Sequence, residues 1–178
     1  MGNVELEKVT SVKYLGVMLD EQVTWANQVE YLKSKLSRSA GIFSKLRYYL
    51  NTETLMEMYH ALFNSHLQYA ILCWGSACST MLNCLQIVQN KAIRNMMKSP
   101  RFFRLDNHYL NLRILQVTDL YNMEVAKFMY SHSNGTLPSC FDSFFHEIND
   151  LHYHNTRASS NRDYITPYYR SSRGQRSI

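Results

Sequence analysis

The strongest constraint on the fold is the recurrence of apolar residues at every third or fourth position in three successive stretches of the chain. This spacing places the apolar side chains on one stripe of an α-helix. Breaks at 51–53, 75–76 and 99–100 separate the stretches, and Asn51 or Thr52 can cap the second helix. Three amphipathic helices with short connections pack most simply as an antiparallel bundle. The stripes are, in order, Val29, Leu32, Leu36, Ala40, Phe43, Leu46 and Leu50; Leu55, Met58, Tyr59, Leu62, Phe63, His66, Leu67 and Ala70; and Leu82, Leu85, Val88, Ala92, Ile93 and Met96.

The rest of the chain completes a mainly α fold with a short N-terminal β-hairpin. Residues 9–19 are rich in β-branched and aromatic types around a single Gly16, which predicts a strand pair or a bulged strand. Further helices are predicted over about 117–132 and 141–148. The apolar repeat is absent from 151–178, an arginine- and tyrosine-rich tail that we expect to be loosely ordered when free. The predicted division is a hairpin at 1–20, a helical bundle at 21–100, a helical connector at 101–150 and a basic tail at 151–178.

Charge and composition point to an anionic partner inside the cell. The formal net charge is +5 and the isoelectric point is about 9.0, and lysine and arginine gain affinity for phosphates by releasing counterions. The first residues contain acids where a secretory signal needs an apolar run, so we expect free thiols and a cytoplasmic or nuclear location. The longest apolar stretch, 69–74, is too short to cross a membrane, so no membrane is expected as a partner.

No motif of a catalytic site is present in the sequence. Catalysis by two metal ions needs paired carboxylates, and the chain has no Asp-Asp pair. Its adjacent acids, Asp20 and Glu21, stand where a strand gives way to a helix, and we expect them to stabilise the helix start. Neither a Gly-x-Ser-x-Gly turn nor a Gly-Lys-Ser/Thr loop occurs. We therefore predict no catalytic residue, no cofactor and no small-molecule substrate.

Histidines and cysteines do not follow the spacing of a metal site. The residues that could supply four ligands are Cys140, His146, His152 and His154. Zinc ligands come in tight pairs on a knuckle, which these spacings do not provide, so we expect surface histidines, a core thiol and no metal. A second group, Cys73, Cys78 and Cys84, lies across a helix break, and we expect small buried packing residues there.

A basic and aromatic segment is the clearest candidate for binding. It has no acid, and two phenylalanines, Phe102 and Phe103, lie among its cations. Cations hold a phosphate backbone while aromatic rings stack on unpaired bases, so the mixture suits a single strand or a contact that follows a groove of a duplex. Equally, the charges can be a solvated helix face and the phenylalanines core. The cations are Lys91, Arg94, Lys98, Arg101 and Arg104.

Several short strings, in a fixed order, resemble the reverse transcriptases of LINE-type, jockey-like non-LTR retrotransposons. Val12–Asp20 followed by Thr24-Trp25 resembles the end of the reverse transcriptase domain, and Gln89–Arg94 resembles a Gln-Asn-Lys-Ala-x-Arg string farther on. The resemblance extends over nearly the whole chain, through the strings 112–120, 137–141, 154–157 and 174–178.

This resemblance implies the end of a palm, a thumb-like three-helix bundle and the region that follows. Tyr14, Leu15 and Gly16 would take the place of the primer grip. The thumb cations that would hold the backbone of an RNA/DNA template-primer duplex are Lys33, Lys35, Arg38 and Arg47. The family's Tyr-x-Asp-Asp motif and its magnesium would belong to a palm preceding Val4. We therefore expect a decayed or partial reading frame that is inactive alone.

Two functions remain open on this basis. One is a fragment of an RNA-directed DNA polymerase that retains template-primer binding. The other is a helical protein–protein interaction module, co-opted by the host or docking on a separate palm chain through the free strand edge near Tyr14. A chain without function is a third outcome.

Overall fold

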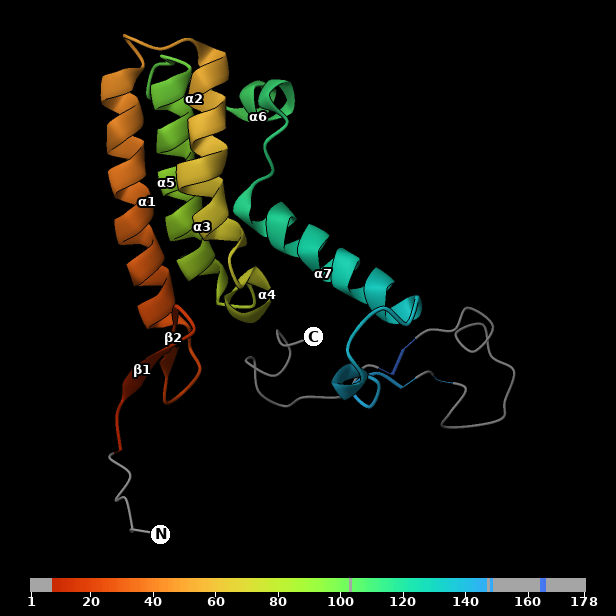
Figure 1. Cartoon of the computed structure of the whole chain (residues 1–178). Helices are drawn as coiled ribbons and strands as arrows, with labels where there is room; N and C mark the ends of the chain where they lie inside the picture. The colour runs from red at the N-terminus through yellow and green to blue at the C-terminus, as the bar shows by residue number, and fades with distance from the viewer. Residues whose placement is uncertain (1–7, 103, 147, 149–163, 166–178) are drawn as a thin grey trace. The chain divides into compact units, whose positions relative to one another are not determined.

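The computed structural model describes residues 8–102, 104–146, 148 and 164–165 of the 178-residue chain (Figure 1). The chain divides into two compact units, Met1–Glu124 and Val125–Ile178. The four-part division expected from the sequence stays a prediction. Each unit is described below by itself.

The first unit begins with the predicted β-hairpin. Strand β1 (Ser11–Tyr14) pairs antiparallel with β2 (Val17–Asp20), and Tyr14 lies opposite Val17. The two residues between the strands, Leu15 and Gly16, both have positive φ, 44° and 82°. Such a two-residue turn matches the right-handed twist of the strands that it joins.

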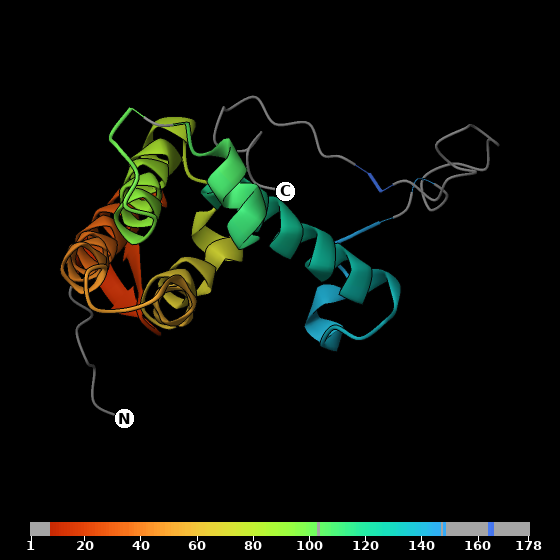
Figure 2. The same cartoon turned by 90° about the horizontal axis from the view of Figure 1, so that it is seen from above.

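Three helical segments then form the predicted antiparallel succession. Helix α1 (Ala26–Leu46) is followed by α2 (Thr52–Tyr59), the π-helix η1 (His60–Asn64) and α3 (Ser65–Gln68) as a second segment, and by α5 (Ser79–Met96) as a third. Figure 1 shows α1 and α5 running in one direction and α2–α3 in the other, and Figure 2 looks along them. A short helix, α4 (Ile71–Trp74), connects α3 to α5.

The second segment differs from the expected uninterrupted helix. Asn51 caps it as predicted, because its side chain accepts a hydrogen bond from the Thr54 amide at 2.8 Å. One turn, His60–Asn64, is a π-helix, and Ala70 has a φ of 52° that ends the segment. Neither the π-helix nor the positive φ of Ala70 involves a glycine or a proline. The sequence therefore contains no sign that the helix is interrupted at these positions.

The core of the first unit contains most residues of the predicted stripes, although Leu62, placed on the second stripe, is 39% exposed. Phe43, Tyr59 and Phe63 meet at its centre, and the rings of Tyr59 and Phe63 stack with centroids 5.2 Å apart. Asn95 of α5 donates to the backbone oxygen of Ala40 at 2.8 Å and ties the two parallel helices together. Buried aromatic side chains of this size contribute the largest share of burial energy in such a core.

Residues beyond Pro100 close one side of this core. A short helix, α6 (Asp106–Leu112), was not predicted, and α7 (Val117–Ser133) confirms the helix expected over about 117–132. Leu105, Tyr109 and Val117 are buried against the bundle. The sequence of α6 is too short to show a helical repeat.

The described residues of the second unit contain an aromatic cluster. The ring of Phe128 contacts those of Phe141 and Phe145, and His132 contacts Tyr164. The helix expected over 141–148 does not form across its described residues 142–146, which are turn and coil after the short 3-10 helix η2 (Ser139–Phe141). Apart from 164–165, the tail at 151–178 lies outside the described residues. No helix in the described part of the chain is long and apolar enough to cross a membrane.

Candidate nucleic-acid interface

The tip of the hairpin projects Tyr14, Leu15 and Gly16 together. The side chains of Tyr14 and Leu15 are 63% and 73% exposed. The turn is fixed from behind by Tyr69, whose hydroxyl donates to the Leu15 carbonyl. A Cβ atom on Gly16 would lie 3.4 Å from Cε1 of the same ring. The segment between α3 and α4 therefore holds the hairpin tip in place.

Two polar side chains attach the hairpin to α1. Asp20 accepts hydrogen bonds from the Thr24 amide and hydroxyl, both at 2.8 Å, and from the Trp25 amide at 2.9 Å. Burial would raise the pKa of Asp20, but these hydrogen bonds outweigh it and the pKa is lowered. Gln28, which is buried, accepts from the Met18 amide at 2.9 Å. Asp20 therefore fixes the loop that leads into α1, whose own first turn contains no acid.

One flank of α1 carries a cluster of cations around a tyrosine. Lys35 and Lys13 place their ammonium groups 4.8 Å and 5.3 Å from the ring centroid of Tyr31. Hydrogen bonding from Lys35, together with the charges of both lysines, lowers the pKa of Tyr31. Burial and then the charge of Lys35 lower the pKa of His66 on α3. Lys13 was not among the predicted cations, although it lies in the family string at 12–20.

The predicted cations of α1 do not share a single face. Arg38 follows Lys35 by three positions and lies on the same flank, whereas Lys33 lies on another, because helix positions two apart diverge. Lys33 also pairs with Glu30 at 3.3 Å. Arg47 follows the last residue of α1 at the end of the bundle. The structure thus places Lys35 and Arg38 on one flank of α1 and places Lys33 and Arg47 away from that flank.

The Gln-Asn-Lys-Ala-x-Arg string divides between the core and the surface. Gln89 and Ala92 are fully buried, while Lys91 is exposed. Asn90 accepts from the hydroxyl of Tyr109 at 2.6 Å. Arg94 lies three positions after Lys91 on the outward side, and its Nε is buried without a hydrogen-bond partner. The string therefore combines structural amides with outward cations.

The remaining basic residues follow α5. Lys98, Arg101 and Arg104 are exposed. Phe102 is 94% exposed, which excludes for this ring the alternative of a core position, whereas Phe103 lies outside the described residues.

Few of the predicted cations form ion pairs with described residues. Lys33 pairs with Glu30, and Lys8, which is outside the predicted set, pairs with Glu21. The other predicted cations have no acidic partner among the residues described. An uncompensated basic surface attracts polyanions, because the field of its charges is not cancelled locally.

The cysteines do not lie where packing was expected. Cys73, Cys84 and Cys140 are exposed and Cys78 is half-buried, so the expectation of buried thiols is wrong. Cys73 and Cys84 lie off the buried stripes of their helices. No group of three potential metal ligands occurs among the described residues, and the candidates His152 and His154 lie outside them.

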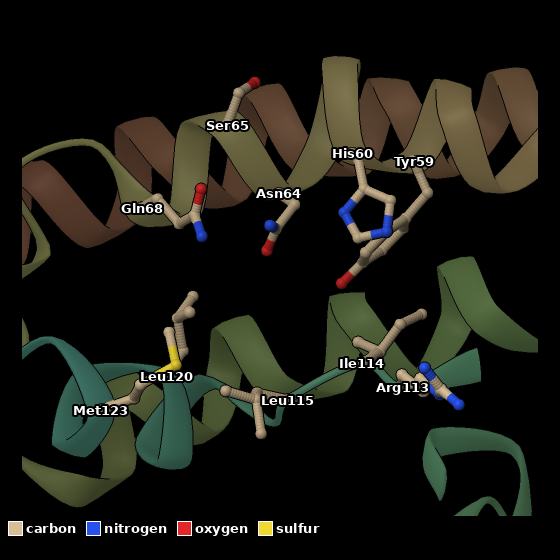
Figure 3. A pocket seen from close by; sticks show the side chains of 10 residues that line it. All are labelled: Tyr59, His60, Asn64, Ser65, Gln68, Arg113, Ile114, Leu115, Leu120 and Met123. Atoms are coloured by element: carbon tan, nitrogen blue, oxygen red, sulfur yellow. The ribbon is translucent and has the colours of Figure 1, made fainter. Parts of the chain in front are cut away.

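A pocket of about 440 Å³ opens beside the π-helix (Figure 3). One wall presents the polar side chains of His60, Asn64 and Gln68, and the other presents apolar residues such as Leu115 and Leu120. The remaining lining residues are Tyr59, Ser65, Arg113, Ile114 and Met123. Its place on the far side of α2–α3 from α1 separates it from the basic flank around Tyr31.

Comparison with known proteins links the chain to mobile elements. It is 25% identical over 129 residues to the probable RNA-directed DNA polymerase from transposon X-element of Drosophila melanogaster, and 26% identical over 132 residues to that from transposon BS of the same species. It is 27% identical over 119 residues to the RNA-directed DNA polymerase from mobile element jockey of Drosophila funebris.

These matches cover 70%, 70% and 65% of the chain but only 14%, 14% and 13% of the relatives. No family model and no solved structure matches the chain. The resemblance expected from the short strings is confirmed: the chain is a relative of a short part of the RNA-directed DNA polymerases of jockey-like non-LTR retrotransposons.

Proposed function

We propose that this chain is a thumb-like segment of a retrotransposon reverse transcriptase that binds the backbone of an RNA/DNA template-primer duplex. The observation that carries the proposal is the set of outward cations on and after α1 and α5 that lack acidic partners among the described residues. The related proteins suggest the nature of the anion, since they are named as RNA-directed DNA polymerases.

The cation cluster around Tyr31 is the strongest part of this surface. Lys13 and Lys35 come from different elements and converge on one ring, with Arg38 along the same flank. Ammonium groups that share an aromatic ring are held in position, so less side-chain entropy is lost when a phosphate binds. The hairpin tip at Tyr14 to Gly16 belongs to the same surface in this proposal, as the counterpart of a primer grip.

The test is binding of a labelled RNA–DNA hybrid by the purified chain across a series of salt concentrations. Affinity should fall by about 0.9 log units per contacted phosphate for each log unit of salt. Lys35→Gln and Arg38→Gln should each weaken binding and reduce the salt slope by about one. Lys8→Gln is the matched control, because it removes the same charge from a lysine already paired with Glu21. The proposal would be contradicted if the affinity for the hybrid did not depend on salt. It would also be contradicted if the three substitutions lowered that affinity equally.

A second candidate function rests on the exposed edge of β1. This strand pairs with β2 on one side, and among the described residues no strand pairs with its other side. Val12 and Tyr14 are exposed beside that edge. A free edge can receive a strand from another chain, such as a separate palm. Association with another protein that persists at high salt, without binding of the hybrid at low salt, would favour this function.

A further inference from the structure

Exposed aromatic rings gather with cations at one end of the bundle. Helices α1 and α5 end there and α2 begins there (Figure 1). Tyr48 and Tyr49 on the connection after α1 are 68% and 84% exposed, and Phe102 on the connection after α5 is 94% exposed. These rings contribute little to the core, so their presence at the surface needs another explanation.

Tyr48 is the point where the two connections meet. The guanidinium of Arg47 lies 4.8 Å from its ring centroid, and the ammonium of Lys98 lies 5.8 Å from it. Arg47 also donates from Nη2 to the Tyr48 hydroxyl at 2.7 Å, while its Nε is buried without a partner. Both cations are therefore held beside one ring.

Lys98 has a left-handed backbone conformation at the end of α5, and its ammonium lies over the ring of Tyr48. The Ser99 amide donates to the Arg94 carbonyl at 3.0 Å, which closes α5 with a Schellman motif. Lys98 occupies the left-handed position of that motif, with a φ of 53°, where glycine is the usual residue. A lysine at this position is disfavoured by local sterics, yet it places an ammonium over Tyr48.

The charges of this end identify the class of partner. Residues 45–52 and 91–105 contain seven lysines and arginines and no acid. The nearest acids along the chain are Glu53 and Asp106, and neither forms an ion pair within the described residues. An uncompensated cationic surface with exposed rings suits a polyanion with unpaired bases better than a protein surface.

We propose that Arg47, Tyr48, Tyr49, Lys98 and Phe102, together the Tyr48 platform, bind single-stranded nucleic acid next to the duplex. Bases stack on the open rings of Tyr49 and Phe102, and phosphates contact Arg47 and Lys98. Bases within a duplex already stack on one another, so exposed rings add affinity only for an unpaired strand. This inference rests on the proposed function, because it assumes that nucleic acid reaches the chain.

Two probes separate the Tyr48 platform from the duplex-binding surface. One is a labelled oligouridylate of roughly 12 nucleotides, within the usual site size for single strands, and the other is a blunt RNA–DNA hybrid of equal length. Tyr49→Ala and Phe102→Ala should each weaken oligouridylate binding by about five- to a hundredfold, with hybrid affinity within about twofold of the unsubstituted chain. Tyr130→Ala is the matched control, because Tyr130 is 73% exposed on α7 and should change neither affinity.

Lys98→Gly tests the strained position without risk to the fold. Glycine adopts this φ without steric cost, so the midpoint of thermal unfolding should be unchanged or higher. Oligouridylate affinity should nevertheless fall severalfold, because the ammonium is lost. A loss of binding together with a loss of stability would overturn the role assigned to Lys98.

The outcomes also separate this inference from the proposed function. If Lys35→Gln and Arg38→Gln leave hybrid binding unchanged while Tyr49→Ala weakens oligouridylate binding, the duplex proposal fails and the Tyr48 platform stands. The inference is overturned if Tyr49→Ala and Phe102→Ala behave like Tyr130→Ala, or if they weaken both probes equally. It is also overturned if the chain does not bind oligouridylate at low salt but self-associates through Tyr49.

Discussion

Gln89 donates its side-chain amide to the hydroxyl of Tyr59 at 2.9 Å, and both side chains are fully buried. The same nitrogen donates to the Leu115 carbonyl at 2.8 Å, and the amide oxygen accepts from the hydroxyl of Tyr109 at 3.3 Å. One amide therefore joins α5 to α2, to α6 and to the segment that precedes α7. The glutamine of the Gln-Asn-Lys-Ala-x-Arg string therefore has a structural role in the core. The cations of the string, Lys91 and Arg94, do not share that role and can take part in binding.

Replacing Gln89 should destabilise the first unit. Gln89→Ala leaves the buried Tyr59 hydroxyl without that partner, at a cost of about 1–3 kcal/mol, and it also removes the hydrogen bond to the Leu115 carbonyl. Urea denaturation followed by circular dichroism measures the change. Asn83→Ala, an exposed position on the same helix, is the control and should change stability little. Equal midpoints for the two variants would show that the amide contributes nothing.

Tyr59 also predicts how stability changes at alkaline pH. Burial raises the pKa of Tyr59 to about 12 from an ordinary value of 10.0, although the hydrogen bond with Gln89 opposes the shift. The stability from the neutral phenol is complete below pH 10.0 and is lost as the pH rises through about 12. The loss amounts to about 2–3 kcal/mol. Urea denaturation over this pH range should give a shallower decline for Tyr59→Phe than for the unsubstituted chain, and parallel declines would contradict the prediction.

The helices could be predicted because their signal is local. Leu32, Leu36 and Phe43 are buried as their spacing predicted, since the period of an α-helix dictates which positions share a face. The Asn51 cap was recognisable for the same reason, because its partner, Thr54, lies three residues away. The β-hairpin likewise follows from neighbouring residues around Gly16.

The polar anchors of the fold could not be predicted in this way. Gln28 bonds to Met18 across 10 positions, and Gln89 bonds to Tyr59 across 30. A glutamine near an apolar stripe looks like the polar edge of a helix until its distant partner is known. The Tyr48 platform was hidden for the same reason, because Lys98 lies 50 positions from Tyr48 and only the parallel course of α1 and α5 brings them together.

The turn of the hairpin offers a matched pair of substitutions. Gly16→Ala places a Cβ at a φ of 82° against the ring of Tyr69 and should cost about 1–2 kcal/mol. Leu15→Gly removes a side chain from a φ of 44°, so relief of strain should offset the added backbone entropy and leave stability within about 1 kcal/mol. The midpoints of thermal unfolding of the Gly16→Ala and Leu15→Gly variants measure this difference in stability. A larger loss for Leu15→Gly would mean that the Leu15 side chain, and not the turn geometry, stabilises the hairpin.

Acid titration should reveal the hydrogen bonds that Asp20 makes at the start of α1. Its pKa is lowered from 3.8, so the carboxylate stabilises the folded chain fully above that value, and the contribution is lost as the pH falls through the lower folded pKa. The difference in unfolding free energy between the unsubstituted chain and Asp20→Ala should therefore be largest near neutral pH and should narrow below pH 3.8. Asp20→Asn retains one acceptor for the Thr24 or Trp25 amide, so it should be intermediate and should lack this acid dependence. Urea midpoints measured across the acidic range give all three curves. A difference that stays constant through the titration would show that Asp20 acts through its shape and not through its charge.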